Sequence, residues 1–513
     1  MSLHSRADKE QSSLRASALI PTISKFEEQL MGETVETDKH VEDPTQFNPQ
    51  AEARLRFKID LMIIPTITLL YLVCFIDRAN IGNARLAGFE KELGLEGYDY
   101  NIVLSYFFVS YIVFEMPANI LCKRIGPGWF IPATTLFFGV ASIGTAFVKN
   151  MAQASVVRFI VGAFEAGMFP CMAYYLSRWY RRSELVFRIS FYIASAPLAG
   201  AFGGLLSSGI LSLSHFGTLH RWRMIFAVEG IITCGLALIS FLTLTDRPET
   251  ARWLTREEKD LAIARVKSER VGQTELLDKL DIPKLIRGMT CPVTLAVTFV
   301  FFFSNITVQG LGLFLPTIIA SIYPEKTVVQ QQLQTVPPYI VGTFFTMLIP
   351  YLSWRFDRRL PFFIACAPFV MLGYIMLLAS NNPHVRYGAT FVIASSSFSF
   401  GALCMAEVSA NVVSDTARAS ALATTVTLGS IGALVSTWSY LPFDSPRFVI
   451  GNGLNLATSS VILVVSVILL GWMTVDNRKR GRREGGGEVI LNELSEKEIE
   501  DLDWRHPGFR WHP

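Results

Sequence analysis

Four ionisable residues stand inside long apolar runs, where acids and bases are unexpected. Asp77 and Arg78 are neighbours near the end of the run from residue 58 to 80, and Arg158 and Glu165 lie in the run from 152 to 176. Arg158 and Glu165 are two helical turns apart on one face, about 10 Å by helical rise. A carboxyl group kept out of water can hold a proton at neutral pH. The planar fork of an arginine binds both oxygens of a carboxylate. These residues therefore indicate proton transfer and anion binding.

The composition shows which elements must position these residues. The 513 residues are 51% hydrophobic and only 17% charged, whereas soluble domains carry about 25% charged residues. The apolar residues gather in blocks long enough to cross a hydrocarbon core of about 30 Å as helices. We predict an all-α polytopic membrane protein whose twelve spans lie near residues 58–80, 100–121, 129–148, 152–176, 187–212, 222–245, 292–320, 332–354, 361–380, 386–411, 418–441 and 447–474.

The charged segments between these blocks divide the chain into two six-helix halves. The predicted parts are a disordered cytoplasmic N-terminal tail (1–53), the first half (54–245), a cytoplasmic linker (246–291), the second half (292–475) and a cytoplasmic C-terminal tail (476–513). Lysine and arginine concentrate in the loops on one side, which places both termini and the linker in the cytoplasm. Within the linker, Thr255 and Glu258 form a capping-box pattern that predicts a helix.

The first half holds most of the ionisable residues that lie within predicted spans, and the second half holds few. An ionisable group at the bilayer centre costs at least about 2.5–3.5 kcal/mol, so each is expected to face a cavity or a partner. We assign substrate binding to Arg78, Arg158, Asn305, Gln309 and Asn411, and proton coupling to Asp77, Glu165, Glu229 and Glu407. Pairs such as Arg158 with Glu165, or Arg78 with Asp77, would alternate between internal pairing and release. The alternative is a permanent salt-bridge network that only fixes the helices.

Two short basic turns occupy equivalent positions in the halves. Lys123 and Arg124 follow the second span, and Asp357 and Arg358 follow the eighth, which indicates an internal duplication. Glu115 precedes the first of these turns by about two helical turns. We expect these five residues to serve a cytoplasmic gate or a structural role. A six-plus-six arrangement places the transport site between the halves.

The stretches around these residues resemble a known family. FIDRANIGNARLAG, SYFFVSYIVFEMPANILCKRIGP, RFIVGAFEAGMFPCMAYYLSRWYRRSE and RWRMIFAVEGIIT are similar to the major facilitator superfamily. Within it they resemble the anion:cation symporters, especially the fungal allantoate, nicotinate and pantothenate permease branch, from about residue 55 to 475. The resemblance implies uptake of organic anions with protons, and it implies anion binding and proton coupling by Asp77, Arg78, Arg158 and Glu165.

The tenth span departs from that branch. Glu407 stands near a position where the fungal relatives commonly have tryptophan, while Asn411 is kept. Thr416-Ala417-Arg418 lacks the lysine of the relatives' Thr-Lys-Arg. An acid at this point would favour a zwitterionic or cationic moiety, or a substrate unlike the common ones.

The sequence therefore predicts a proton-coupled symporter for a small carboxylate such as a vitamin or a nitrogen-source acid. It would be a plasma-membrane monomer whose partners are its substrate, protons and lipid, without nucleic acid. One alternative is an exporter working by antiport, although SAPLAGAFGGLL lacks the Gly-Pro that exporters of the superfamily usually carry. A second is a non-transporting nutrient sensor. The seven cysteines show no metal-ligand spacing, and no catalytic triad or nucleotide loop is evident. We therefore expect no metal, no cofactor and no enzymatic activity.

Overall fold

The computed structural model describes residues 49–180, 182–213, 217–268, 282–412, 415–491, 503–505 and 509–512. The chain divides into two units, residues 1–52 and 53–513, and the fold below is that of the second. The predicted N-terminal tail, up to residue 48, lies outside the described residues.

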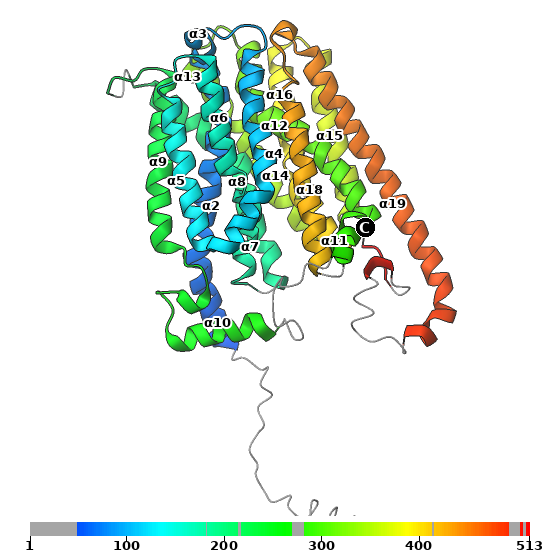
Figure 1. Ribbon diagram of the computed structural model, residues 1–513. Helices are drawn as coiled ribbons and strands as arrows, with labels where there is room; N and C mark the ends of the chain where they lie inside the picture. The colour runs from blue at the N-terminus through cyan, green and yellow to red at the C-terminus, as the bar shows by residue number, and fades with distance from the viewer. Residues whose placement is uncertain are drawn as a thin grey trace, which may run out of the picture. The chain divides into compact units, whose positions relative to one another are not determined.

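Across these ranges the structure is helical, and twelve helices or helix pairs are long and apolar enough to cross a membrane (Figure 1). The six spans of the first half are α2 (Pro49–Leu86), α4 (Asp99–Ile125), α5 (Pro127–Thr145), α6 (Met151–Glu165) with α7 (Met168–Ser177), α8 (Arg182–Leu211) and α9 (Trp222–Thr243). Those of the second half are α12 (Pro292–Ile322), α13 (Val328–Leu333) with α14 (Val336–Phe356), α15 (Leu360–Ala379), α16 (Pro383–Ser397) with α17 (Ser399–Ala410), α18 (Asp415–Ser436) and α19 (Val449–Leu491). The predicted fold class is confirmed.

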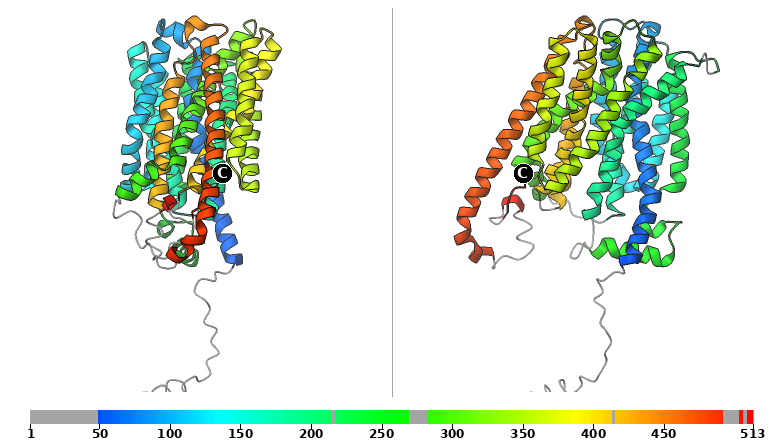
Figure 2. Two further views of the ribbon diagram at one scale, coloured as in Figure 1. Left: turned by 90° about the vertical axis from the view of Figure 1, so that its right-hand side faces the viewer. Right: turned by 180° about the vertical axis from the view of Figure 1, so that it is seen from behind.

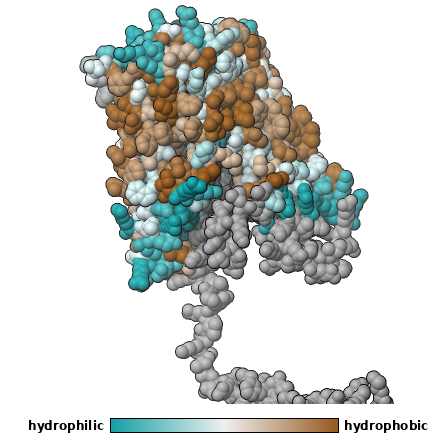
Figure 3. All heavy atoms as spheres, in the orientation of Figure 1, coloured by the Kyte–Doolittle hydropathy of each residue, from teal (hydrophilic) through white to brown (hydrophobic). Residues whose placement is uncertain are grey.

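The surface of this bundle matches a bilayer. Apolar side chains form a broad belt over the middle of the helices, and polar side chains gather towards both ends (Figure 3). Helices suit this environment because each backbone N–H and C=O group finds its partner within the segment. The structure itself carries no membrane orientation, so the cytoplasmic location of the termini stays a prediction.

Short elements mark the two ends of the bundle. One end carries α3 (Phe89–Leu93) and η2 (Pro442–Asp444), and we call it the α3 end. The other carries η1 (Pro248–Thr250), α10 (Arg256–Ser268), α11 (Ile282–Met289) and η3 (Asp503–Arg505), and we call it the α10 end (Figures 1 and 2). The charge distribution predicts that the α10 end is cytoplasmic.

The predicted helix in the linker is confirmed as α10. The Thr255 backbone N–H donates to the Glu258 carboxylate over 2.9 Å, and the Glu258 N–H donates to Thr255 Oγ1 over 3.3 Å. Lys58 of α2 also donates to Glu258 over 2.7 Å, which lowers the pKa of that carboxyl group. The linker helix is thereby fastened to the first half.

The first and last spans are longer than predicted. α2 begins at Pro49, where helix-favouring Ala, Glu, Arg and Leu residues precede the apolar run, and α19 ends at Leu491, beyond a charged stretch that follows its apolar run. Ion pairs support these extensions: Arg56 contacts Glu184 at 3.3 Å, and Arg480 contacts Asp476 one turn away at 2.7 Å.

Direct contacts join the two halves at the α3 end. The amide of Asn101 donates to the Thr437 carbonyl over 2.5 Å, and the Gln332 amide donates to the Asn83 carbonyl over 3.2 Å. Gly200 of α8 lies against Tyr339 of α14, so closely that a Cβ atom at Gly200 would stand 2.6 Å from the Tyr339 ring. These contacts close the α3 end of the interface between the halves.

Candidate functional site

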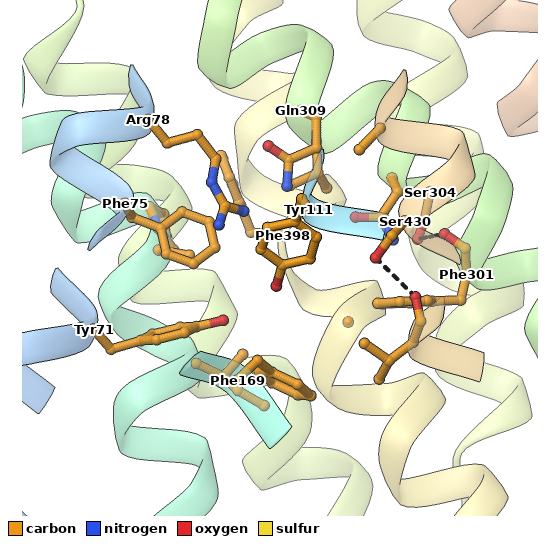
Figure 4. Close-up of a pocket in the computed structure, with 18 of the residues that line it drawn as sticks. Tyr71, Phe75, Arg78, Tyr111, Phe169, Phe301, Ser304, Gln309, Phe398 and Ser430 are labelled. Atoms are coloured by element: carbon orange, nitrogen blue, oxygen red, sulfur yellow. Dashed lines mark hydrogen bonds between the residues drawn. The ribbon is translucent and has the colours of Figure 1, made fainter. Parts of the chain in front are cut away.

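A cavity lies between the two halves, with about 900 Å³ of empty space, part of it open to solvent. Its walls come from α2, α4, α7 and α8 on one side and from α12, α16–α17 and α18 on the other (Figure 4). Aromatic rings dominate the lining: Tyr71, Phe75, Phe108, Tyr111, Phe169, Phe301 and Phe398. Of the predicted substrate ligands, Arg78, Asn305 and Gln309 line this cavity.

Arg78 is the one charged residue among the described residues that line the cavity. Its guanidinium carbon lies 4.7 Å from the Phe75 ring centroid and 5.1 Å from that of Tyr111. Its Nη2 donates to Glu165 Oε2 over 3.0 Å. Aromatic faces attract a guanidinium and hold its plane in place. Arg78 is thus a fixed cation that faces an otherwise uncharged chamber.

Glu165 lies behind Arg78 rather than in the cavity lining. It is fully buried and also accepts a hydrogen bond from Cys74 Sγ over 3.3 Å. Its second oxygen, Oε1, has no hydrogen-bond partner in the described part of the chain. Glu165 is the last residue of α6, where the helix breaks before α7. A buried carboxylate whose main partner is a cavity arginine can gain a proton when that arginine is taken by another anion.

The second pair lies outside the cavity lining. Arg158 Nη1 stands 3.8 Å from Asp77 Oδ2, and Asp77 Oδ1 accepts a hydrogen bond from Ser142. Glu229 of α9 is also buried, and neither of its carboxylate oxygens has a hydrogen-bond partner among the described residues. The Asp77–Arg158 pair and Glu229 therefore form a buried polar cluster that the cavity lining does not include.

The structure pairs these four residues differently from the sequence-based hypothesis. Arg78 pairs with Glu165 and Arg158 with Asp77, so the expected pairs within each span are corrected. The reason is helical geometry: neighbouring residues point about 100° apart, and residues two turns apart are separated by about 10 Å. Each arginine therefore reaches the acid on the other helix.

Gln309 faces Arg78 from the second half (Figure 4), and Asn305 lines the same cavity. They are one turn apart on α12 and so share one face of it. Across the residues that the structure describes, neither side-chain amide makes a hydrogen bond within the protein. Both are therefore available to a bound molecule.

Asn411 and Glu407 are buried at the α10 end of α17 and are not among the cavity-lining residues. The Asn411 amide donates to Glu407 Oε1 over 2.9 Å and to the His512 carbonyl over 3.1 Å. Asn411 is thus occupied by protein groups. Its predicted contact with substrate, like that of Arg158, has no support from its position.

The predicted gate residues do not form one cluster. Glu115 is 4% exposed, and its Oε2 has no hydrogen-bond partner in the described ranges. Lys123 and Arg124 are exposed on the α10 side of α4, and Lys123 lies 5.8 Å from the Tyr174 ring centroid. Asp357 is 76% exposed and contacts Arg359 at 3.5 Å, and Arg358 is exposed beside it.

Sequence reasoning missed Asp246, which holds the turn after α4. It pairs with Arg178 at 3.2 Å and accepts from the Gly128 N–H over 3.5 Å. Gly126 in the same turn has a positive φ of 100°, and a Cβ atom there would lie 2.6 Å from the Asp246 carboxylate. The signal was present, since Asp246 is the first charged residue after the sixth apolar run.

The aromatic lining was also missed, although its periodicity is visible. Tyr71, Phe75 and Arg78 follow one another at four and three residues along α2, which places them on one helical face. A search for aromatic residues in register with the buried arginine would have found them.

Two six-helix halves around a central cavity that holds a buried arginine define a multi-pass membrane transporter. The sequence profile of the Major Facilitator Superfamily matches residues 67–437, and the chain belongs to this superfamily.

Relatives support the assignment along most of the chain. "MFS transporter prlL" of Fungal sp. is 33% identical, over 86% of this chain and 90% of that protein. The "High-affinity nicotinic acid transporter" of Saccharomyces cerevisiae is 30% identical, over 93% of this chain and 86% of that protein.

Solved structures share the fold. An inward-facing bacterial homologue of the human lysosomal transporter Spinster has a TM-score of 0.60 at 15% identity, over 82% of this chain and 96% of that one. A D-xylose-proton symporter has a TM-score of 0.59 at 14% identity, over 78% of this chain and 97% of that one.

Proposed function

We propose that the protein is a proton-coupled symporter that takes up a small organic anion by alternating access. One observation supports this proposal above all. Arg78 is the charged residue of the described cavity lining, and it pairs at 3.0 Å with the carboxylate of Glu165, which does not line the cavity. The anion binds Arg78 from the cavity side. The proton binds Glu165, which then no longer needs the arginine as its counter-ion.

This arrangement couples the two ligands through charge. With Glu165 ionised, its pair with Arg78 is neutral, and a second anion at Arg78 would leave an uncompensated negative charge in an apolar chamber. Protonation of Glu165 removes that charge and frees guanidinium donors for the substrate. Anion and proton therefore bind most favourably together, which is the requirement for symport.

The lining favours a carboxylate attached to a flat or ring-shaped body. Aromatic side chains surround Arg78, and ring stacking is worth about 0.5–1.5 kcal/mol for each pair beyond the buried area. Asn305 and Gln309 add hydrogen-bonding groups opposite the arginine. Nicotinic acid, named for the yeast relative, has this chemistry and is the first compound to test.

The second buried cluster has a supporting role. We assign the Asp77–Arg158 pair to fixing α2 against α6, and Glu229 to a second protonation step. Glu407 remains a candidate for proton coupling in the second half. We further propose that the protein works as a plasma-membrane monomer with both termini in the cytoplasm.

Uptake of matched compounds tests this function. Cells that express the protein are given radiolabelled nicotinate or its neutral amide, which keeps the ring and lacks the negative charge. We expect saturable uptake of the acid, faster at low external pH, and no uptake of the amide. Equal uptake of both compounds would contradict anion recognition. Lower accumulation than in control cells would favour the exporter, and unchanged accumulation of a panel of small carboxylates would favour the sensor.

A further inference from the structure

The chain's last described residues, 503–505 and 509–512, pack against the α10 end of the second half. We call them the C-terminal segment. Figures 1 and 2 show it beside the lower part of α19. Trp511 in this segment is only 2% exposed and belongs to the hydrophobic core of the second half. The predicted cytoplasmic tail thus includes a docked portion.

Two asparagines hold the backbone of this segment from two different helices. The Asn477 side chain of α19 donates to the Trp511 carbonyl and accepts from the Trp511 N–H, each over 2.9 Å. The Asn411 side chain, directly after α17, donates to the His512 carbonyl over 3.1 Å and accepts from the His512 N–H over 2.9 Å. Each amide therefore pairs with both backbone groups of one residue, as a neighbouring β-strand would.

The alternation of these bonds fits an extended chain. In an extended strand the backbone groups of successive residues point to opposite sides. The backbone N–H and C=O of Trp511 point to α19, and those of His512 point to Asn411 at the end of α17. The segment therefore lies between the two helices and joins them. Because these bonds involve only backbone atoms of the segment, they hold it in position but do not give the site any preference for particular side chains.

The Trp511 side chain gives the site its preference for this sequence. Its indole N–H donates to Asp476 Oδ2 over 2.8 Å, and its ring lies 5.3 Å from the Trp472 ring and 4.9 Å from the Phe509 ring, between centroids. Arg480 pairs with Asp476 and donates to the Trp504 carbonyl over 3.1 Å. The binding site for the segment thus combines a polar clamp with an aromatic pocket.

The helix that the segment holds is part of the cavity wall. α17 is separated from α16 at Phe398, and Phe398, Gly401 and Met405 all line the cavity. Asn411 directly follows the far end of α17, and the segment joins it to α19. A short helix with a break at one end and a clamp at the other has little freedom to move while the clamp is closed.

We propose that the C-terminal segment is an intramolecular latch that restrains α17 and thereby slows the conformational cycle of the transporter. Its release, by a cytoplasmic partner or by modification of the tail, would raise the transport rate. The site is a peptide-binding site whose occupant in this structure is the C-terminal segment of the same chain. The effect on rate rests on the proposed function, whereas the restraint on α17 does not.

Three variants of the full-length protein test the latch. His512→Pro removes the backbone N–H that donates a hydrogen bond to Asn411 Oδ1, while the preceding Trp511 can keep an extended conformation. Trp511→Ala removes the aromatic anchor. His512→Ala is the matched control, because the His512 side chain is exposed and the residue is held through its backbone.

Two readouts separate the latch from the proposed function. Hydrogen–deuterium exchange of the α17 amides reports the restraint without any substrate, and we expect it to be about fivefold faster or more in His512→Pro and Trp511→Ala than in wild type or His512→Ala. Nicotinate uptake, normalised to the amount of protein in the membrane, should rise about twofold in the same two variants with unchanged KM.

Unchanged α17 exchange in both release variants would overturn the latch, whether or not nicotinate is transported. Faster α17 exchange with unchanged or slower uptake would overturn its control of the rate. If no variant transports nicotinate, the proposed function loses support, and the exchange measurement alone decides whether the segment restrains α17.

Discussion

Replacing Arg78 with lysine keeps the positive charge of the cavity but removes the planar guanidinium with its several N–H donors. The guanidinium uses Nη2 for Glu165 at 3.0 Å, and its Nε has no hydrogen-bond partner among the described residues. Protonation of Glu165 frees guanidinium donors, so the planar fork can present two N–H groups to a substrate carboxylate. A lysine ammonium is a compact point charge without this fork, and it cannot fill the planar space between Phe75 and Tyr111.

The expected cost follows from these contacts. Lysine loses at least one hydrogen bond between charged groups, worth about 1.5–3 kcal/mol. Since about 1.4 kcal/mol is a factor of ten in affinity, Arg78→Lys should weaken substrate binding about 10- to 150-fold. The loss should appear as a higher KM for nicotinate uptake, with the protein still present in the membrane.

The control is Arg85→Lys on the same helix. Arg85 pairs with Glu90 at 2.9 Å near the α3 end and does not line the cavity. The KM of Arg85→Lys for nicotinate should stay within about twofold of wild type, since Arg85 does not line the cavity and lysine keeps the positive charge beside Glu90. If the KM of Arg78→Lys stayed as close to wild type as that of Arg85→Lys, the substrate would not bind the Arg78 guanidinium.

Three further predictions concern the amide ligand, the closed end and the linker helix. Gln309→Leu removes one neutral hydrogen-bonding group from the cavity, so KM for nicotinate should rise about two- to tenfold without loss of maximal rate; an unchanged KM would remove Gln309 from the site. Gly200→Ala places a methyl group 2.6 Å from the Tyr339 ring, which should force the two halves apart at the α3 end. A cysteine introduced at the α3 end between the halves should then be labelled faster. In the control Gly209→Ala, which has no atom within 4 Å of its new Cβ, the same cysteine should be labelled as in wild type. Glu258→Gln should lower the free energy of unfolding at pH 7 by about 1 kcal/mol or less. Because the pKa of Glu258 is lowered in the folded protein, that difference should be present above its unfolded pKa near 4.3 and shrink as pH falls through the folded value. A difference that grew on acidification would contradict the Lys58–Glu258 contact.

The twelve spans were predictable because their signal is local. A run of about twenty apolar residues leaves the backbone no alternative to a helix in hydrocarbon. Arg78, Asn305 and Gln309 were predictable as cavity residues for a related reason, since a polar group in such a run must face a partner or a cavity.

The pairing of the buried charges was not predictable, because it depends on how α2 and α6 are rotated about their axes. Sequence spacing gives the depth of Asp77, Arg78, Arg158 and Glu165 but not which arginine faces which acid. The helix breaks after Glu165 and at Phe398 likewise depend on packing between spans.

The docked C-terminal segment was missed for a different reason. Its neighbourhood is charged and rich in glycine, a composition typical of disorder. The aromatic residues Trp504, Phe509 and Trp511 were the contrary signal, since they give a short segment enough apolar surface to be held against a helix bundle.

Proton movement with and without Glu165 shows whether this carboxylate carries the coupled proton. Purified wild-type protein and Glu165→Gln, in liposomes with a pH-sensitive dye inside, are given an inward nicotinate gradient without a pH gradient. We expect wild type to acidify the interior as nicotinate enters, and Glu165→Gln to transport nicotinate without acidification and without dependence on pH. Acidification by Glu165→Gln at the wild-type ratio of protons to nicotinate would contradict the assignment of the coupled proton to Glu165.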